Sequence, residues 1–140
     1  MKKQLIQPDT GDWADHDVAY AEGVVVHTDE AKRVYISGTV SDADGIETQT
    51  RDVLERIESM LASVGGDLRD VVRVRVYLNE PALSAESLEA VHEVRNEFFD
   101  GEHLPASTLV EVENMVTEEY LIEIDADAVI PDDGWEVKSI

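Results

Sequence analysis

The pattern of hydrophobic and polar residues predicts a β-hairpin near the start of the chain. Residues 18–28 are rich in β-branched side chains, and residues 33–40 (RVYISGTV) form a second segment of the same kind. A polar turn at 29–32 separates the two segments, so we expect them to pair as antiparallel strands. Residues 1–16 are polar and lack a regular pattern, which predicts an irregular arm.

Two further segments have the spacing of amphipathic helices. Residues 46–64 carry apolar side chains three and four positions apart, after a polar loop at 41–45 that provides N-cap chemistry. Gly65-Gly66 ends this helix, because glycine readily adopts the left-handed conformation that follows helices. A second helix is expected over residues 84–99, where a glutamate-rich side stands opposite the buried residues Leu88, Val91, Phe98 and Phe99.

Three more strands complete the predicted fold. Residues 108–112 and 120–129 have strand patterns and are joined by the segment 113–119. Residues 71–78 alternate strictly, so one side of that strand carries Val72, Val74, Val76 and Leu78 and the other carries Arg73, Arg75 and Tyr77. The polar side of this strand fits either a face packed against another subunit or a face in contact with solvent.

The predicted order β-β-α-β-α-β-β defines an α+β sandwich, a mixed sheet with both helices on one face. We expect one folded domain over residues 17–130, flanked by the arm at 1–16 and by a C-terminal extension at 131–140. The sequence has no run of 18 apolar residues, no apolar segment after Lys2 and Lys3, and no cysteine. These absences predict a cytoplasmic protein without a membrane partner.

The chain is strongly acidic. It contains 32 Asp and Glu residues against 11 Lys and Arg residues, for a net charge of −21, and the acidic residues are spread along its length. Such a surface repels phosphate backbones, so we expect no nucleic-acid partner. Dispersed acid with few lysines favours a halophilic host, where salt screens the repulsion. A moderately acidic mesophilic protein is the alternative.

Short segments at fixed spacings carry a family resemblance: Ile36-Ser37-Gly38, Gln49-Thr50-Arg51, Val64-Gly65-Gly66-Asp67-Leu68, Glu97-Phe98-Phe99, Pro105-Ala106, Val110-Glu111-Val112 and Ile122-Glu123-Ile124. In order and spacing these segments resemble the YjgF/RidA (Rid, endoribonuclease L-PSP-like) family. The likeness runs from about residue 18 to about residue 129, which is nearly the whole predicted domain.

The resemblance implies the YjgF/chorismate-mutase-like fold and a homotrimer. In such a trimer the three sheets surround a central β-barrel, and small-molecule clefts lie between the subunits. Active family members hydrolyse reactive enamines and imines, released by pyridoxal-phosphate enzymes, to 2-keto acids and ammonia. The resemblance implies no metal and no organic cofactor, and the four histidines (His16, His27, His92 and His103) show no metal-ligand spacing.

The sequence departs from the family pattern at residue 107. In the family an arginine within a Pro-Ala-Arg-Ser motif holds the substrate's carboxylate, whereas here Pro105-Ala106 is followed by Ser107. A neutral hydroxyl cannot replace a bidentate arginine. Three explanations are open: the protein binds without catalysing, its ligand lacks a carboxylate, or the role passes to Arg73, Arg75 or Arg95.

The resemblance assigns a catalytic role to Glu123, which matches a glutamate that orients the water or the amine. This residue stands in an apolar strand and points away from Ile122 and Ile124. An exposed glutamate on a half-solvated strand is the alternative. Tyr20 matches a tyrosine that lines the cleft, and packing in the core is the alternative for it.

Other matched positions are expected to bind substrate. Gly38 and Leu109 match places where backbone groups line the pocket, and Ser107 stands beside them. His92 falls where relatives often have an asparagine that reaches in from the neighbouring subunit, although a surface histidine is the commoner case. Two tryptophans in the terminal extensions either cap the cleft or pack on the outside: Trp13 and Trp135.

These features favour a Rid-like homotrimer that binds small metabolites in clefts between its subunits, in which Ser107 argues against 2-imino acid deaminase activity. The alternative is an active hydrolytic enamine or imine deaminase that acts on a modified or carboxylate-free substrate. An endoribonuclease or translation inhibitor is disfavoured. The charge opposes RNA, and the sequence shows no His–His or His–Lys pair suited to phosphodiester cleavage.

Overall fold

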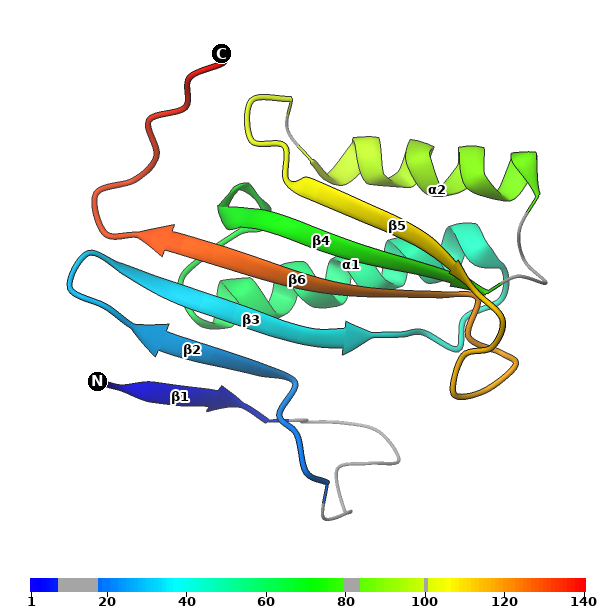
Figure 1. The fold of residues 1–140 in the computed structure, drawn as a ribbon, viewed down its shortest axis with the longest axis horizontal. Helices are drawn as coiled ribbons and strands as arrows, with labels where there is room; N and C mark the ends of the chain where they lie inside the picture. The colour runs from blue at the N-terminus through cyan, green and yellow to red at the C-terminus, as the bar shows by residue number, and fades with distance from the viewer. Residues whose placement is uncertain (8–17, 80–83, 100) are drawn as a thin grey trace.

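The β-branched segments of the chain form the strands of one mixed sheet. The computed structural model describes residues 1–7, 18–79, 84–99 and 101–140, and within these residues the strand order is β1-β2-β3-β6-β4-β5 (Figure 1). Strands β4 and β5 are parallel, and the other neighbours are antiparallel. The elements are β1 (Lys3–Ile6), β2 (Gly23–His27), β3 (Ala31–Thr39), α1 (Ile46–Ser63), the short 3₁₀ helix η1 (Leu68–Asp70), β4 (Val71–Asn79), α2 (Ala85–Phe98), β5 (Ala106–Val112) and β6 (Ile122–Pro131).

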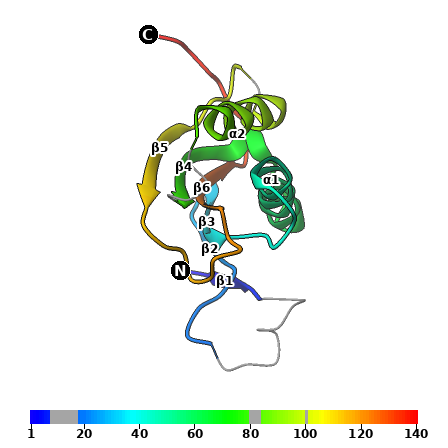
Figure 2. The same ribbon diagram turned by 90° about the vertical axis from the view of Figure 1, so that its right-hand side faces the viewer.

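Helices α1 and α2 cover the same face of the sheet, and no helix of the described residues lies on the opposite face (Figure 2). The predicted α+β sandwich is therefore confirmed. The core between helices and sheet is built from fully buried aliphatic side chains, each of which contributes about 1.5–3 kcal/mol when removed from water. The largest of them come from α1, β4 and β6: Leu54, Ile57, Leu61, Leu78, Ile122 and Ile124.

The N-terminal arm is not irregular over its whole length, contrary to the expectation. Strand β1 pairs antiparallel with β2, with Lys3 opposite Val26 and Ile6 opposite Gly23. Four residues are too few to show a pattern in the sequence. Pairing with β1 satisfies backbone hydrogen-bonding groups of β2, which would otherwise be an open edge strand. The side chain of Ile6 also packs against the core.

The alternation of β4 is as predicted except at Val72. Across β6, Val71 pairs with Ala128 and Arg73 pairs with Asp127, so two steps on β4 correspond to one step on β6. This β-bulge leaves Val72 without a direct partner and turns it outward, and Val71 is buried in its place. Beyond the bulge the expected two-sided pattern continues to the end of the strand.

Helix α2 begins after Ser84, whose hydroxyl accepts a hydrogen bond from the backbone of Ser87. Its fully buried residues are Val91 and Val94. Val94 was missing from the predicted buried face, whereas the expected Leu88 and Phe98 are only partly buried against the core. None of the helices in the described residues is long and apolar enough to cross a membrane.

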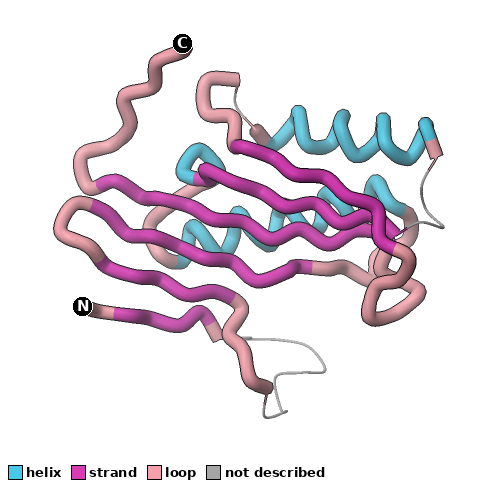
Figure 3. The backbone as a smooth tube through the Cα atoms, in the orientation of Figure 1, coloured by secondary structure: helices cyan, strands magenta, loops and turns pink. Residues whose placement is uncertain are grey.

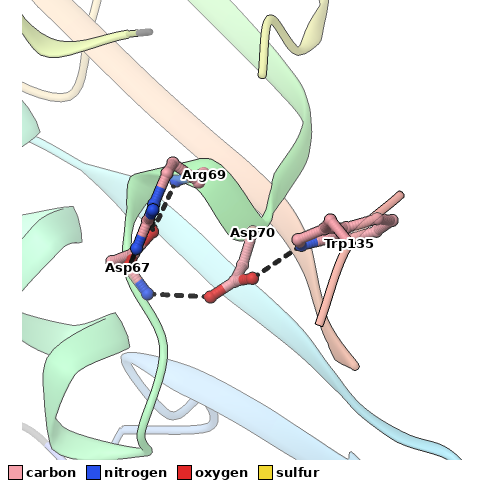
Figure 4. Close-up of polar contacts among 4 residues, drawn as sticks. All are labelled: Asp67, Arg69, Asp70 and Trp135. Atoms are coloured by element: carbon pink, nitrogen blue, oxygen red, sulfur yellow. Dashed lines mark hydrogen bonds and ion pairs between the residues drawn. The ribbon is translucent and has the colours of Figure 1, made fainter. Parts of the chain in front are cut away.

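The C-terminal extension is attached to the body by the Asp132 N–H, which donates to the carbonyl of Glu30, and by the side chain of Trp135. The Trp135 indole donates a hydrogen bond to Asp70 Oδ1 at 2.8 Å, and Asp70 Oδ2 accepts from the backbone of Asp67 at 2.9 Å (Figure 4). Asp70 is only 8% exposed. Asp70 therefore links η1 to the C-terminal extension at the start of β4. Trp13 lies outside the described residues.

We predict that Trp135→Phe lowers the free energy of unfolding by about 1 kcal/mol, because the indole hydrogen bond to a buried carboxylate is lost while the apolar ring is kept. Denaturant unfolding followed by far-UV circular dichroism measures this loss. Val137→Ala, at an exposed position of the same extension, is the matched control and should change stability by less than about 0.5 kcal/mol. Equal stabilities for the two variants would show that the contact does not hold the extension.

Candidate functional site

An open groove of about 1070 Å³ lies beside the end of β3. Its walls come from the segment before β2, from the ends of β3 and β4, from the beginning of β6, from the loop between β5 and β6, from the loop after β3 and from α1, which contributes Arg56, Ser59, Met60 and Ser63. Figure 3 shows that this loop lies at the end of the sheet where β3 ends. The residues most relevant to chemistry are Tyr20, Ser37, Gly38, Tyr77, Tyr120 and Glu123.

Glu123 reaches the groove because β6 alternates as predicted. Ile122 and Ile124 are buried in the core at 0% and 1% exposure, so the glutamate between them points to the other face of the sheet. Its register partner on β4 is Tyr77. The sequence-based orientation of Glu123 is thus confirmed, and its position in a groove is a new finding.

A β-bulge in β3 brings Gly38 against the side chain of Glu123. Along the pairing with β6, Ile36 matches Ala126 and Thr39 matches Ile124, which leaves one extra residue on β3. A Cβ atom added to Gly38 would lie 2.7 Å from Glu123 Oε1, closer than such atoms normally approach. A side chain at position 38 would therefore displace the end of the Glu123 side chain, and its absence leaves the space in which the carboxylate lies.

The environment of Glu123 favours its protonated form. Partial burial is the main cause that raises the pKa of this carboxyl, and the charge of Asp125 raises it further. Within the described residues, no hydrogen-bond donor or cation is paired with the Glu123 carboxylate. Asp125 and Asp127, which point to the same face of the sheet, are instead paired with Arg75. A partly desolvated, unpaired carboxylate beside a groove has the properties of a general base.

Asp125 and Asp127, the next outward residues of β6, are both bound by Arg75. Its guanidinium lies 2.6 Å from Asp125 Oδ1 and 3.1 Å from Asp127 Oδ2, and the Tyr77 hydroxyl donates to Asp125 at 3.3 Å. These contacts raise the pKa of Arg75 and pair it with two carboxylates of its own chain. Arg75 is therefore a poor substitute for the missing arginine.

The two residues that follow Tyr20 are held against β3 by Ser37. The Ser37 hydroxyl donates to the carbonyl of Ala21 at 2.7 Å, and the Ser37 N–H donates to the carbonyl of Glu22 at 2.9 Å. The Tyr20 side chain is 51% exposed and lines the groove. The structure thus places Tyr20 at the groove and not in the core.

The start of β6 is positioned from the helix side by Gln49, which is 2% exposed. Its amide donates to the carbonyls of Ala43 and Glu119, and its carbonyl accepts from the backbone of Leu121. The segment that leads into Glu123 is therefore fixed at two points to α1. A buried amide with all these contacts satisfied holds its neighbours rigidly.

The remaining predicted residues lie at a different place in the subunit. Ser107 and Leu109 pair with Val74 and Val76, whose side chains are buried under the helices, so both face the helix side of β5. His92 is exposed on the adjacent helix α2. The structure thus joins Tyr20, Gly38 and Glu123 in one groove and separates them from His92, Ser107 and Leu109.

Arg95 of α2 connects this second group. Its Nη2 donates a hydrogen bond to Ser107 Oγ at 2.8 Å. Arg73, the third candidate cation, lies near the opposite end of β4 from Tyr77. No cluster of three or more His, Asp or Glu side chains suited to a metal ion is present in the described ranges.

Sequence reasoning missed several residues of the groove, chiefly Tyr77, Tyr120 and the loop residues Asn114 and Met115. The strand pattern indicated that Tyr77 shares a face with Arg75. It could not indicate that Tyr77 lies opposite Glu123, because that register joins strands with a helix and another strand between them in sequence. The loop has no pattern from which its position could be inferred.

The comparisons with known proteins agree with this fold. A sequence model of the family described as Endoribonuclease L-PSP matches residues 15–130. A solved structure from Mycobacterium tuberculosis, a member of the YjgF/YER057c/UK114 family, is 32% identical and superimposes with a TM-score of 0.77 over 92% of this chain and 100% of that chain. RidA from an Antarctic Psychrobacter is 25% identical, with a TM-score of 0.71 over 91% of this chain and 99% of that chain.

A curated relative, a RutC family protein of Pyrococcus horikoshii, is 41% identical over 81 residues. That match covers 58% of this chain and 60% of the relative, which is less than two thirds of either sequence. The fold and the groove define an α+β domain of the YjgF type. The chain belongs to the Endoribonuclease L-PSP family, the YjgF/RidA family that its sequence resembles.

We predict that Glu123→Gln stabilises the subunit at neutral pH and that the gain disappears in acid. Because the folded state raises the pKa of Glu123, its ionised form opposes folding above that pKa. Below the unfolded value of about 4.3 the natural side chain is protonated in both states, and the difference vanishes. Melting temperatures of the two proteins between about pH 8 and about pH 4 measure the effect.

Glu111→Gln, which removes the same charge from an exposed position on β5, corrects for the net charge. A Glu123→Gln gain no larger than that of Glu111→Gln, or one that grows as the pH falls, would contradict the pKa assignment.

Proposed function

We propose that this chain forms a homotrimer whose inter-subunit clefts bind small imines or enamines and hydrolyse them to carbonyl products and ammonia. The observation that carries the proposal is the Glu123 carboxylate. It is half-buried, faces an open groove beside Gly38, has a raised pKa and has no cation paired with it in the described residues. Residues held in that state are typical of general bases.

The separation of the predicted residues within one subunit supports a site shared between subunits. Glu123 and Tyr20 lie at the groove on the open face, whereas Ser107 and His92 lie by the edge strand β5 on the helix side. A second copy that brings its β5 edge to the groove would unite the two groups. Exposed Tyr35 on the bare face of the sheet offers apolar surface for such a contact.

The chemistry needs few groups. A water hydrogen-bonded to the Glu123 carboxylate attacks the imine carbon, and the carboxylate takes one water proton as the carbon–oxygen bond forms. The electron pair of the carbon–nitrogen double bond moves to nitrogen, and Glu123 returns the proton there to give a carbinolamine. Glu123 then takes the proton of the new hydroxyl group and passes it to the nitrogen, so that the carbon–nitrogen bond breaks, ammonia leaves and the carbonyl forms. Tyr20 walls the groove, and backbone groups near Gly38 are available to the ligand.

A metabolite-binding trimer without turnover is the second candidate. Ser107 favours it, because this serine stands where relatives with imine chemistry are expected to have arginine. The RNA-cleaving activity suggested by the family's description is disfavoured by the net charge of −21, which repels a phosphate backbone. We also propose a cytoplasmic location and a halophilic host, on the acidic composition and the absence of cysteine.

We predict that the protein accelerates the loss of 2-iminopropionate or 2-iminobutyrate generated in high salt. Glu123→Ala should reduce this acceleration by about 10²–10⁴-fold, the range typical for removal of a general base. Gly38→Ala should reduce it by about 10²-fold, because the added methyl group displaces the Glu123 carboxylate by roughly 1 Å. Continuous measurement of imine concentration provides the rates.

Gly101→Ala is the matched control, since a Cβ at that position meets nothing within 4 Å, and its rate should equal that of the natural protein. Light scattering in the assay buffer should give the mass of a trimer. If the protein does not accelerate imine loss but a ligand still raises its melting temperature, the hydrolase is excluded and the metabolite-binding trimer is supported. A monomeric mass would contradict both candidates.

We predict that the melting temperature rises by at least about 5 °C between low salt and molar KCl, which corresponds to roughly 1 kcal/mol. The described ion pairs use few of the 32 acidic residues, namely Asp52, Asp67, Glu97, Asp125, Asp127 and Glu136. Screening of the remaining repulsion is the expected cause, so NaCl should act like KCl. A melting temperature that does not rise would exclude the halophilic origin.

A further inference from the structure

Arg95 is a half-buried cation without a carboxylate partner. It extends from the third turn of α2 toward β5, and its one described side-chain contact is the hydrogen bond from Nη2 to Ser107 Oγ at 2.8 Å. No ion pair joins it to any carboxylate among the described residues. Arg33 and Arg73 also have no ion pair among the described residues, so Arg95 differs from them by its hydrogen bond to Ser107.

Four other arginines differ from Arg95 because each forms an ion pair with a carboxylate. Arg51, Arg56, Arg69 and Arg75 each lie within 3.3 Å of a carboxylate oxygen. Burial acts alone on Arg95 and lowers its pKa, with no anion to oppose the effect. Burying an unpaired charge costs free energy, and a bound anion would offset that cost.

The contact with Ser107 leaves the right groups available for an anion. A guanidinium carries five N–H donors in a planar fork, and only one of them is engaged. Ser107 accepts that hydrogen bond, so its own hydroxyl hydrogen is free to donate elsewhere. The two side chains together present several donors on the same side of β5, with the exposed His92 one helical turn before Arg95 on α2.

We propose that Arg95, held by Ser107, binds the carboxylate of the ligand, so that the cleft takes small 2-keto or 2-imino carboxylates. The inference rests on the proposed function for the identity of the cleft and for the ligand class, and it adds the residues that hold the charged group of the ligand. The cation comes from helix α2, and the serine of β5 fixes its direction. Ser107 is then a positioning residue for Arg95.

The strongly negative chain makes a local cation necessary for such a ligand. A net charge of −21 repels a free carboxylate from most of the surface, and salt screens this repulsion over distances beyond about 10 Å. At hydrogen-bond distance, a desolvated guanidinium outweighs the screened field of the more distant acids. Selectivity for carboxylates over neutral carbonyl compounds should therefore depend on this one residue.

The test is the affinity of the full-length protein for pyruvate, measured by calorimetry at fixed ionic strength, with acetone as the neutral probe. Arg95→Gln should weaken pyruvate binding by about 10- to 100-fold, whereas Arg95→Lys, which keeps the charge but not the fork, should lose less. Ser107→Ala, which leaves all charges in place, should weaken it several-fold. Arg51→Gln, the same change at an arginine already paired with Glu97, should leave it unchanged.

The outcomes separate the inference from the proposed function. Glu123→Gln should abolish imine hydrolysis and still bind pyruvate. Pyruvate binding that is lost in Arg95→Gln, in a protein that hydrolyses no imine, would support the anion site and overturn the hydrolase. Arg95→Gln that binds pyruvate as tightly as the natural protein would overturn the anion site, whatever the hydrolysis rates. Equal affinity for pyruvate and acetone, or no binding of pyruvate at all, would also overturn it.

Discussion

The alternating sequence of β6 is the constraint on which both the core and the groove depend. Ile122 and Ile124 complete the core while Glu123 between them faces the groove, and the strand is paired on both sides, with β3 and with β4. A shift by one residue would move the carboxylate into the core and the isoleucines into water, so the register is strongly fixed. Gln49 adds a second restraint from α1, since it binds the backbone on either side of Tyr120.

The groove departs from regular sheet geometry at one place, and that place is chemically useful. The bulge at the end of β3 and the glycine within it let a carboxylate lie against the backbone, where it is partly removed from water. Such an arrangement destabilises the ionised side chain, and the surrounding core supplies the stability that tolerates it. The raised pKa of Glu123 therefore follows first from its partial burial and second from the charge of Asp125.

The sequence predicted the element order, the sheet with helices on one face, and the orientation of Glu123, because these follow from local periodicity. It did not predict strand β1, which is too short to show a pattern, or the outward turn of Val72, which depends on a bulge. It also could not show that Glu123 and Ser107 lie apart in one subunit. That separation depends on which strands become neighbours, and periodicity alone carries no information about neighbours.

The distribution of arginines links composition to specificity. In a chain with so few cations, paired arginines such as Arg75 serve to neutralise the acids of the open sheet face, because each is bound to carboxylates of its own subunit. Arg95 is bound only to a neutral hydroxyl among the described residues, so its charge is not yet neutralised. Ser107, at the position where the family resemblance implies an arginine, therefore lies beside a cation that comes from the neighbouring helix. This region of the chain keeps a positive charge, and one hydrogen bond joins that charge to the strand.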